Sequence, residues 1–266
     1  MANSRIHKAL AFYRENGLAA LLRKIGGRAA ALLNRKEYDR FVDSLDGRDH
    51  ASVFSEIYEK NLWTTGESRS GAGSELGYTE NLRARLPELF ERFKIRALID
   101  APCGDFHWMR EVPLADGMSY VGLDIVSGVI AQNQERYGDA RRRFLVSNIT
   151  RDPLPDGDLL MCRDCLFHLS NEDALAALKN FAASNVPYLL TSTHVNRDGF
   201  ANTNIKTGEF RRIDLFSEPF CLPKDVLDRI EDFAPPFPPR EMCLWTREQI
   251  GAALSAMAEK TERSSR

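Results

Sequence analysis

Two short apolar runs that each end in an aspartate carry the clearest chemical signal in this chain. Residues 97–100 are followed by Ala-Pro-Cys-Gly, and residues 120–124 end in a second acid. Such runs are typical of neighbouring parallel strands, and open α/β sheets bind ligands at the carboxyl ends of their strands. Gly104 lets the backbone approach a ligand, because it has no Cβ. Asp124 can accept hydrogen bonds from two ribose hydroxyls, so this spacing predicts a nucleoside cofactor site.

Composition places the chain among ordinary globular proteins. It has 266 residues, of which 43% are hydrophobic and 28% charged, with a net charge of −2. This length suits one large domain or two small ones, and the weak acidic balance argues against nucleic acid as a partner. No window is apolar enough for a membrane span or a secretory signal. Five scattered cysteines fit a reducing compartment, so we expect a cytoplasmic protein.

Residues 1–36 differ from the rest of the chain. Apolar residues recur there every three to four positions, and eight Lys and Arg residues face a single acid, Glu15. The pattern predicts a basic amphipathic helical arm, broken at Gly17 and at 26–27. Two interpretations stay open. The arm contacts anionic membrane at the inner face or a partner, or it packs on its own domain or on a second subunit.

The elements that must position the aspartates alternate along the chain. Residues 37–95 predict a helical cap with a Gly/Ser-rich loop at 66–75 and a helix over 78–93, with Thr79 as its N-cap candidate and Pro87 dividing it. A core follows over residues 96–258. Its predicted strands are 96–100, 119–124, 143–147, 158–162 and 188–194, with helices at 127–137 and 171–183. This alternation predicts a doubly wound, Rossmann-like, mostly parallel seven-stranded sheet.

The pattern changes after the fifth predicted strand. Residues 195–240 are polar and rich in Asn and Pro, which indicates an insertion for the substrate, with a short strand-like piece at 210–215. Residues 241–245 predict a last strand and 246–258 a last helix. The remaining segment, 259–266, is expected to be a disordered tail.

Three polar residues interrupt the apolar segment that follows the fourth strand. Arg163, Asp164 and His168 occur within six positions, and the last two stand four apart. If the segment is helical, Asp164 and His168 share one face and can hydrogen-bond. A histidine oriented by a carboxylate is suited to remove a proton from an acceptor hydroxyl. The alternative is that Asp164 caps a helix and His168 fills a polar pocket.

The same segment contains a C-x-x-C pair, Cys162 and Cys165. A redox role would place the pair after an early strand, and a structural zinc ion would need two further ligands. We therefore interpret both cysteines as small buried hydrophobic residues and expect no metal site.

Residues 100–104 resemble the first cofactor motif of class I S-adenosylmethionine (SAM) methyltransferases, which commonly reads Asp-x-x-Cys-Gly-x-Gly. Phe106 departs from it, because that family usually has its last glycine there. The resemblance also places Asn148, after the third strand, where the family accepts the adenine amino group through a side-chain oxygen. No G-x-G-x-x-G is present, which argues against NAD or FAD as the cofactor.

The stretch from Ile57 to Trp245 resembles a narrower group of bacterial methyltransferases associated with cell-surface polysaccharides and glycolipids. The matching elements include a tryptophan, a Ser-Gly-x-Gly-Ser loop and Cys-Arg-Asp-Cys-Leu-x-His-Leu, and in this group Phe106 is normal. In this chain they are Trp63, residues 70–74, 100–109, 162–169 and 207–211.

The resemblance and the polar positions together imply a full set of site residues. The catalytic pair is His168 with Asp164, and no metal is expected. The cofactor residues are Asp100, Ala101, Cys103, Gly104, Phe106, Trp108, Asp124, Ile125, Asn148, Ile149 and Arg163. Candidates for the acceptor are Trp63, Ser70, Ser74, His194 and Asn196.

The expected reaction is transfer of a methyl group from SAM to a small polar acceptor, with a sugar or glycolipid hydroxyl favoured. Alternatives are a methyltransferase for another small molecule and a SAM-binding scaffold that has lost catalysis. Measuring both SAM binding and methyl transfer distinguishes a methyltransferase from a SAM-binding scaffold.

Overall fold

The computed structural model describes residues 37–63, 66–235 and 237–264. The chain divides into two compact units, residues 1–44 and 45–266. In the first unit the described residues are helical as far as residue 43. The predicted arm at 1–36, with its membrane or subunit contact, lies outside the described residues. Within the described ranges no helix combines the length and the apolar character needed to cross a bilayer.

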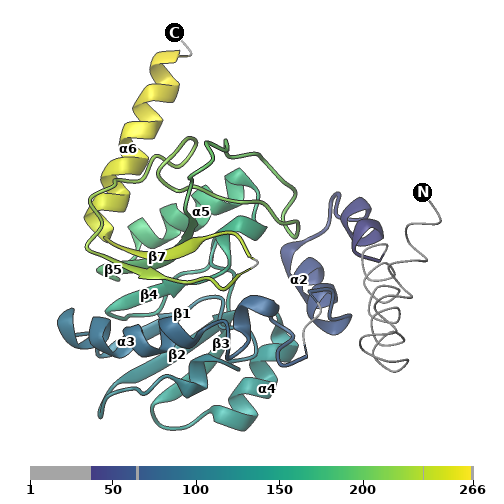
Figure 1. Cartoon of the computed structure of the whole chain (residues 1–266), viewed down its shortest axis with the longest axis vertical. Helices are drawn as coiled ribbons and strands as arrows, with labels where there is room; N and C mark the ends of the chain where they lie inside the picture. The colour runs from purple at the N-terminus through teal and green to yellow at the C-terminus, as the bar shows by residue number, and fades with distance from the viewer. Residues whose placement is uncertain (1–36, 64–65, 236, 265–266) are drawn as a thin grey trace, which may run out of the picture. The chain divides into compact units, whose positions relative to one another are not determined.

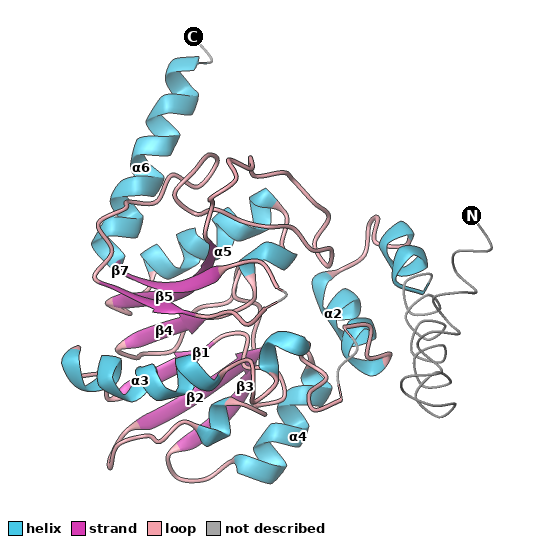
Figure 2. Cartoon of the chain, viewed as in Figure 1, coloured by secondary structure: helices cyan, strands magenta, loops and turns pink. Residues whose placement is uncertain are grey.

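The second unit is built on one seven-stranded sheet in the order β3-β2-β1-β4-β5-β7-β6 (Figure 2). The first five strands pair in parallel, and β7 runs antiparallel to both β5 and β6. The predicted fold class is therefore confirmed for this unit. The strands are β1 Ala97–Asp100, β2 Ser119–Asp124, β3 Arg142–Val146, β4 Leu159–Cys162, β5 Tyr188–His194, β6 Asp228–Glu231 and β7 Arg240–Thr246.

Helices cover both faces of the sheet, which explains why the central strands read as nearly unbroken apolar runs (Figure 1). Alternate residues of one strand enter different cores: Leu98 packs with residues of α3 and α4, whereas Ile99 packs with residues of α5 and α6. The helices of this unit are α2 His50–Glu59, α3 Glu80–Arg92, α4 Ser127–Tyr137, α5 Asn171–Ala183 and α6 Arg247–Ser264.

The six strands that match a predicted strand lie within one residue of their expected bounds, but the edge of the sheet differs from the prediction. The strand-like piece expected at 210–215 is irregular loop, and the edge strand is β6 instead. The sequence gives little sign of β6, because only Ile230 of its four residues is buried. At the other end, α6 continues to Ser264, so the tail expected after Glu259 is helical through that residue.

Pro87 does not divide the helix in which it lies. α3 runs without interruption from Glu80 to Arg92 around it. A proline costs a helix one backbone hydrogen bond and some steric strain. Here four buried residues of α3 pack on the sheet and hold the helix together on both sides of the proline, namely Leu82, Leu86, Leu89 and Phe90. Thr79 occupies the N-cap position, but its hydroxyl donates to the Glu75 carbonyl and caps no helix N–H.

Candidate functional site

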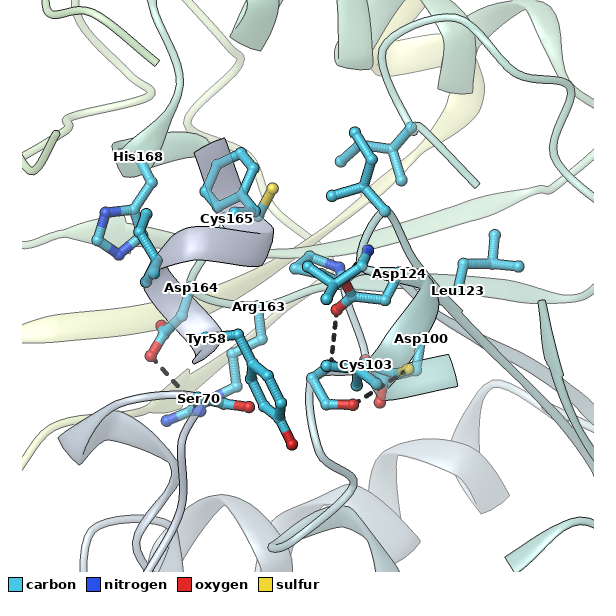
Figure 3. Close-up of a pocket in the computed structure, with 18 of the residues that line it drawn as sticks. Tyr58, Ser70, Asp100, Cys103, Leu123, Asp124, Arg163, Asp164, Cys165 and His168 are labelled. Carbon is cyan, nitrogen blue, oxygen red and sulfur yellow. Dashed lines mark hydrogen bonds and ion pairs between the residues drawn. The ribbon is translucent and has the colours of Figure 1, made fainter. Parts of the chain in front are cut away.

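A cavity lies where the chain leaves the carboxyl ends of β1, β2, β3 and β4. The strand order reverses between β1 and β4, which is where open sheets leave room for a ligand. Figure 3 shows Asp100, Cys103 and Asp124 on one side of the cavity and Asp164, Cys165 and His168 on the other. The predicted residues that line it are Trp63, Ser70, Ser74, Asp100, Cys103, Gly104, Trp108, Asp124, Ile125, Asn148, Ile149, Arg163, Asp164 and His168.

The turn after β1 is fixed by its glycine. Gly104 has a positive φ of 52°, a conformation that other residues adopt at a cost. A Cβ at this position would also collide with the Ser70 hydroxyl. Its N–H donates to Oδ2 of Asp124 at 3.0 Å, and its carbonyl accepts from Nδ2 of Asn133 at 2.7 Å. The turn is therefore held between β2 and α4, with its backbone against the cavity.

Asp124 and Asp100 place two buried carboxyls at the strand ends. Each oxygen of Asp124 accepts one backbone N–H, from Gly104 at 3.0 Å and from Val126 at 2.9 Å. Asp100 accepts from the Tyr120 hydroxyl at 2.7 Å. Burial raises the pKa of Asp124 to about 6 and that of Asp100 to about 7. A ligand that brings hydroxyls or positive charge to these carboxyls would favour their ionised forms.

The loop after β3 supplies a mixed polar and apolar wall. Oδ1 of Asn148 already accepts two hydrogen bonds from Thr150, from N at 3.0 Å and from Oγ1 at 2.8 Å. The oxygen that the sequence assigns to a ligand is thus engaged within the loop. The neighbouring Ser147 hydroxyl is buried and has no partner among the described residues. Ile125 and Ile149 line the same part of the cavity and give it an apolar surface.

Arg163 lines the cavity, but its guanidinium is engaged in the protein. Nε donates to Asp232 at 2.8 Å, and Nη2 donates to the Gly73 carbonyl at 2.7 Å. Asp164, the next residue, pairs with Arg240 at 3.0 Å. The four charged side chains, of Arg163, Asp164, Asp232 and Arg240, alternate in sign, so the cost of burying each charge is offset by its neighbours. Arg163 therefore ties the end of β4 to the glycine loop and to the β6–β7 connection.

The glycine-rich loop is docked over the site in this structure. Oδ2 of Asp105 accepts from the Ser68 hydroxyl at 2.9 Å and from the Arg69 N–H at 3.0 Å, and Oγ of Ser70 accepts from the Asp105 N–H at 2.9 Å. With the Gly73 carbonyl on Arg163, the loop is anchored at both ends. It forms a wall of the cavity next to the turn that contains Gly104.

His168 has a different partner from the one expected. The segment forms a short 3₁₀ helix, Leu166–His168, and Asp164 adopts a positive φ of 54°, so the two side chains do not share a helical face. No hydrogen bond joins them. Nδ1 of His168 lies 2.9 Å from the Glu209 carbonyl, which can only accept, so Nδ1 carries the hydrogen. The expectation that Asp164 orients His168 by a hydrogen bond is wrong.

The surroundings of His168 keep its imidazole neutral. Burial lowers its pKa to about 4, despite the carbonyl contact and the charge of Asp164. With a hydrogen on Nδ1, Nε2 carries a lone pair and has no hydrogen-bond partner among the described residues. The ring stacks on Trp63, with centroids 4.6 Å apart and planes 24° from parallel. The imidazole is thus fixed in one tautomer beside the cavity.

A strap formed by residues 207–211 holds His168 in place. The Gly208 N–H donates to the His168 carbonyl at 2.8 Å, and the Arg211 N–H donates to the Phe167 carbonyl at 3.1 Å. The Thr207 hydroxyl accepts from the Ser170 N–H at 2.9 Å. These bonds, together with the one from Nδ1 to Glu209, fix both the backbone and the ring of His168.

Four predicted site residues lie outside the cavity lining. Ala101 is buried and its N–H donates to Met161. Phe106 packs in an aromatic cluster with Tyr120, Tyr137 and Phe144. His194 is buried, and its Nδ1 accepts from the Ile213 N–H at 3.2 Å. Asn196 donates to Phe200 and Asp214 in its own loop. His194 and Asn196 thus contact residues of the insertion at 195–240 instead of the cavity.

The cavity also contains residues that the sequence analysis did not select. His50, Phe54, Ile57 and Tyr58 come from α2, and Arg69 comes from the glycine-rich loop. Spacings of three and four in α2 indicate one helical face, but they do not say what that face covers. Cys165 also lines the cavity, whereas Cys162 is buried. The described residues contain no group of three or more His, Cys, Asp or Glu placed to hold a metal ion.

Comparisons with known proteins place this architecture among methyltransferases of solved structure. No protein-family model matches the sequence, and no curated protein matches it either. Magnesium protoporphyrin IX methyltransferase (ChlM) from Synechocystis PCC 6803, with bound SAH, is 14% identical with a TM-score of 0.53, covering 74% of this chain and 97% of that one. PigF with SAH is 17% identical with a TM-score of 0.53, covering 76% and 63%. At these identities the chain shares their fold.

Proposed function

We propose that this protein is a SAM-dependent methyltransferase that acts on a hydroxyl of a small polar acceptor, most suitably a sugar or glycolipid. The observation that carries the proposal is one cavity with two different sides. Asp124 and the turn that contains Gly104 lie on one side, and a neutral histidine lies on the other (Figure 3). The shared fold of methyltransferases crystallised with SAM or SAH supports the cofactor assignment.

The residues on the first side fit SAM by their chemistry. Asp124 is a buried acceptor suited to the ribose diol, and the apolar side chains of Ile125 and Ile149 suit the adenine ring. The unpartnered Ser147 hydroxyl and the Asn148 amide nitrogen supply polar contacts to its edge. Gly104 and Asp100 remain for the methionine portion, whose ammonium group would favour the ionised form of Asp100. Bound SAM supplies an electrophilic methyl group.

His168 favours an acceptor that carries a proton on its nucleophilic atom. A neutral hydroxyl must lose its proton as the new bond forms, and Nε2 of His168 has the lone pair that takes it. An imidazole with a pKa of about 4 stays unprotonated and ready at neutral pH, although it is a weaker base than free histidine. Trp63 and Phe54 add flat apolar surfaces beside His168, which suit the C–H face of a sugar ring.

Two measurements on the full chain test the proposal in order. Calorimetric titration should give one site for SAM and for SAH. Incubation with SAM that carries a labelled methyl group, and with fractions of polysaccharide and glycolipid, should give a product in which the labelled methyl group is bonded to oxygen as a methyl ether. As a matched control, Asp139→Asn changes an exposed aspartate whose side chain pairs with Arg142 and is absent from the cavity lining. Absence of SAM binding would refute the proposal, and binding without any methyl transfer would reduce it to a SAM-binding protein.

A further inference from the structure

A second, strongly polar cavity lies next to the first. It is bounded by the end of α2, the loop at 66–69, the turn after β1 and one side of α4. Tyr58 and Arg69 line both cavities, so the two are adjacent. We refer to the second one as the arginine groove. In the proposed function the arginine groove contacts neither SAM nor His168.

Three guanidinium groups from three different elements line this groove. Arg69 comes from the glycine-rich loop, Arg110 from the short 3₁₀ helix Met109–Glu111, and Arg136 from α4. The Arg69 guanidinium lies 5.7 Å from the centre of the Tyr58 ring. Burial and the charge of Asp105 raise the pKa of Tyr58, while Arg69 and Arg136 both act to lower it. Both arginines are therefore close enough to act on the same hydroxyl.

The two acids of the groove form no ion pair with these arginines. Asp105 is occupied by the serine hydroxyls and the N–H of the loop above it. Glu67 accepts from the Leu76 N–H at 2.9 Å and lies 3.4 Å from Nε2 of His107. Arg110 contacts Glu111 and the Tyr137 hydroxyl. Within the described residues, neither Arg69 nor Arg136 forms an ion pair, so both guanidinium groups are available to an anionic ligand.

The groove also offers a hydrogen-bond acceptor in need of a donor. Oδ1 of Asn61 is buried and has no partner among the described residues. A buried unpaired acceptor is costly, and a ligand hydroxyl can satisfy it. Guanidinium forks match phosphate oxygens in geometry as well as charge. The combination of arginines with an unpaired amide oxygen therefore suits a phosphorylated group that also carries hydroxyls.

We propose that the arginine groove binds a phosphate or diphosphate attached to the acceptor, so that Arg69 and Arg136 anchor the substrate while its hydroxyl enters the neighbouring cavity. This inference rests on the proposed function. The same phosphoryl chemistry occurs on a soluble sugar phosphate and on a lipid-linked one. Both would be held by the same arginines.

The test uses inorganic pyrophosphate as the probe, titrated into the full chain in saturating SAH. Arg136→Ala should weaken pyrophosphate binding about tenfold or more, the effect of losing a charged hydrogen bond. Its SAH affinity should not change, because Arg136 does not line the first cavity. Arg85→Ala is the matched control, since Arg85 is an exposed arginine on α3 paired with Glu88. It should bind pyrophosphate like the unaltered chain.

A second arm separates the two sources of phosphate. Phosphatidylcholine vesicles with and without phosphatidic acid are sedimented with the unaltered chain and with Arg136→Ala. Binding that depends on phosphatidic acid and on Arg136 indicates a lipid-linked phosphate, and pyrophosphate binding without it indicates a soluble one.

Three outcomes would overturn the inference: no pyrophosphate binding by the unaltered chain, equal binding by Arg136→Ala, or pyrophosphate binding that occurs without SAH and is lost in saturating SAH, which would assign the groove to the cofactor. SAH titration of the chain without pyrophosphate tests the proposed function separately.

Discussion

Replacing Asp124 should separate its part in the fold from its part in cofactor binding. In the free protein each carboxylate oxygen accepts one backbone N–H, from Gly104 and from Val126. Asp124→Ala leaves both donors without this partner, in a site where Asp124 is only 7% exposed. Each unpartnered buried donor costs about 1–3 kcal/mol, so unfolding should become easier by about 2 kcal/mol or more. Loss of a charged acceptor for the ribose diol should cost a further 1.5–3 kcal/mol of binding, or about tenfold or more in SAM affinity.

Asp124→Asn tests the same interaction with less disturbance of the turn. It keeps the shape and one acceptor oxygen, so it should lose less stability than the alanine variant while still weakening SAM binding about tenfold. Thermal unfolding without ligand gives the first quantity and calorimetry gives the second. If the asparagine variant is folded and binds SAM as tightly as the unaltered chain, Asp124 does not hold the ribose. Asp139→Asn should match the unaltered chain in SAM affinity, because Asp139 does not line the cavity.

Three further predictions concern the rest of the site. His168→Ala should lower turnover by about 10²–10⁴-fold while SAH affinity changes little, and a loss of SAH binding instead would place His168 in the cofactor pocket. SAH affinity, measured by calorimetry, should rise between about pH 5 and pH 8 as Asp124 and Asp100 ionise. The stability of the free protein, measured by thermal unfolding, should fall between about pH 4 and pH 7, because the pKa values of both carboxyls are raised on folding. A reversal of either trend would contradict the assignment of these carboxyls. Gly73→Ala should lower the melting temperature and the turnover, because its Cβ would collide with the Asp164 carboxylate; an unaffected variant would show that the glycine loop moves freely.

The sequence determined the central strands of the sheet and one half of the site. Apolar runs and the helices between them fix the central strands β1, β2, β4 and β5 within one residue, because each of these runs is buried on both faces. The acids that end β1 and β2, with Gly104 between them, then come together for a simple reason. Neighbouring parallel strands end at the same edge, so a local pattern is enough to place Asp100 and Asp124.

Tertiary structure alone decided the other half. The partner of His168 is the backbone carbonyl of Glu209, and every residue has such a carbonyl, so no residue type marks it. Arg163 pairs with Asp232, which lies 69 positions away on a connection that the sequence barely marks. Residues of α2 line the cavity through tertiary packing. Its spacing indicates an apolar face without naming what that face covers. Contacts between distant segments depend on packing and charge compensation across the whole fold, and local residue patterns do not record them.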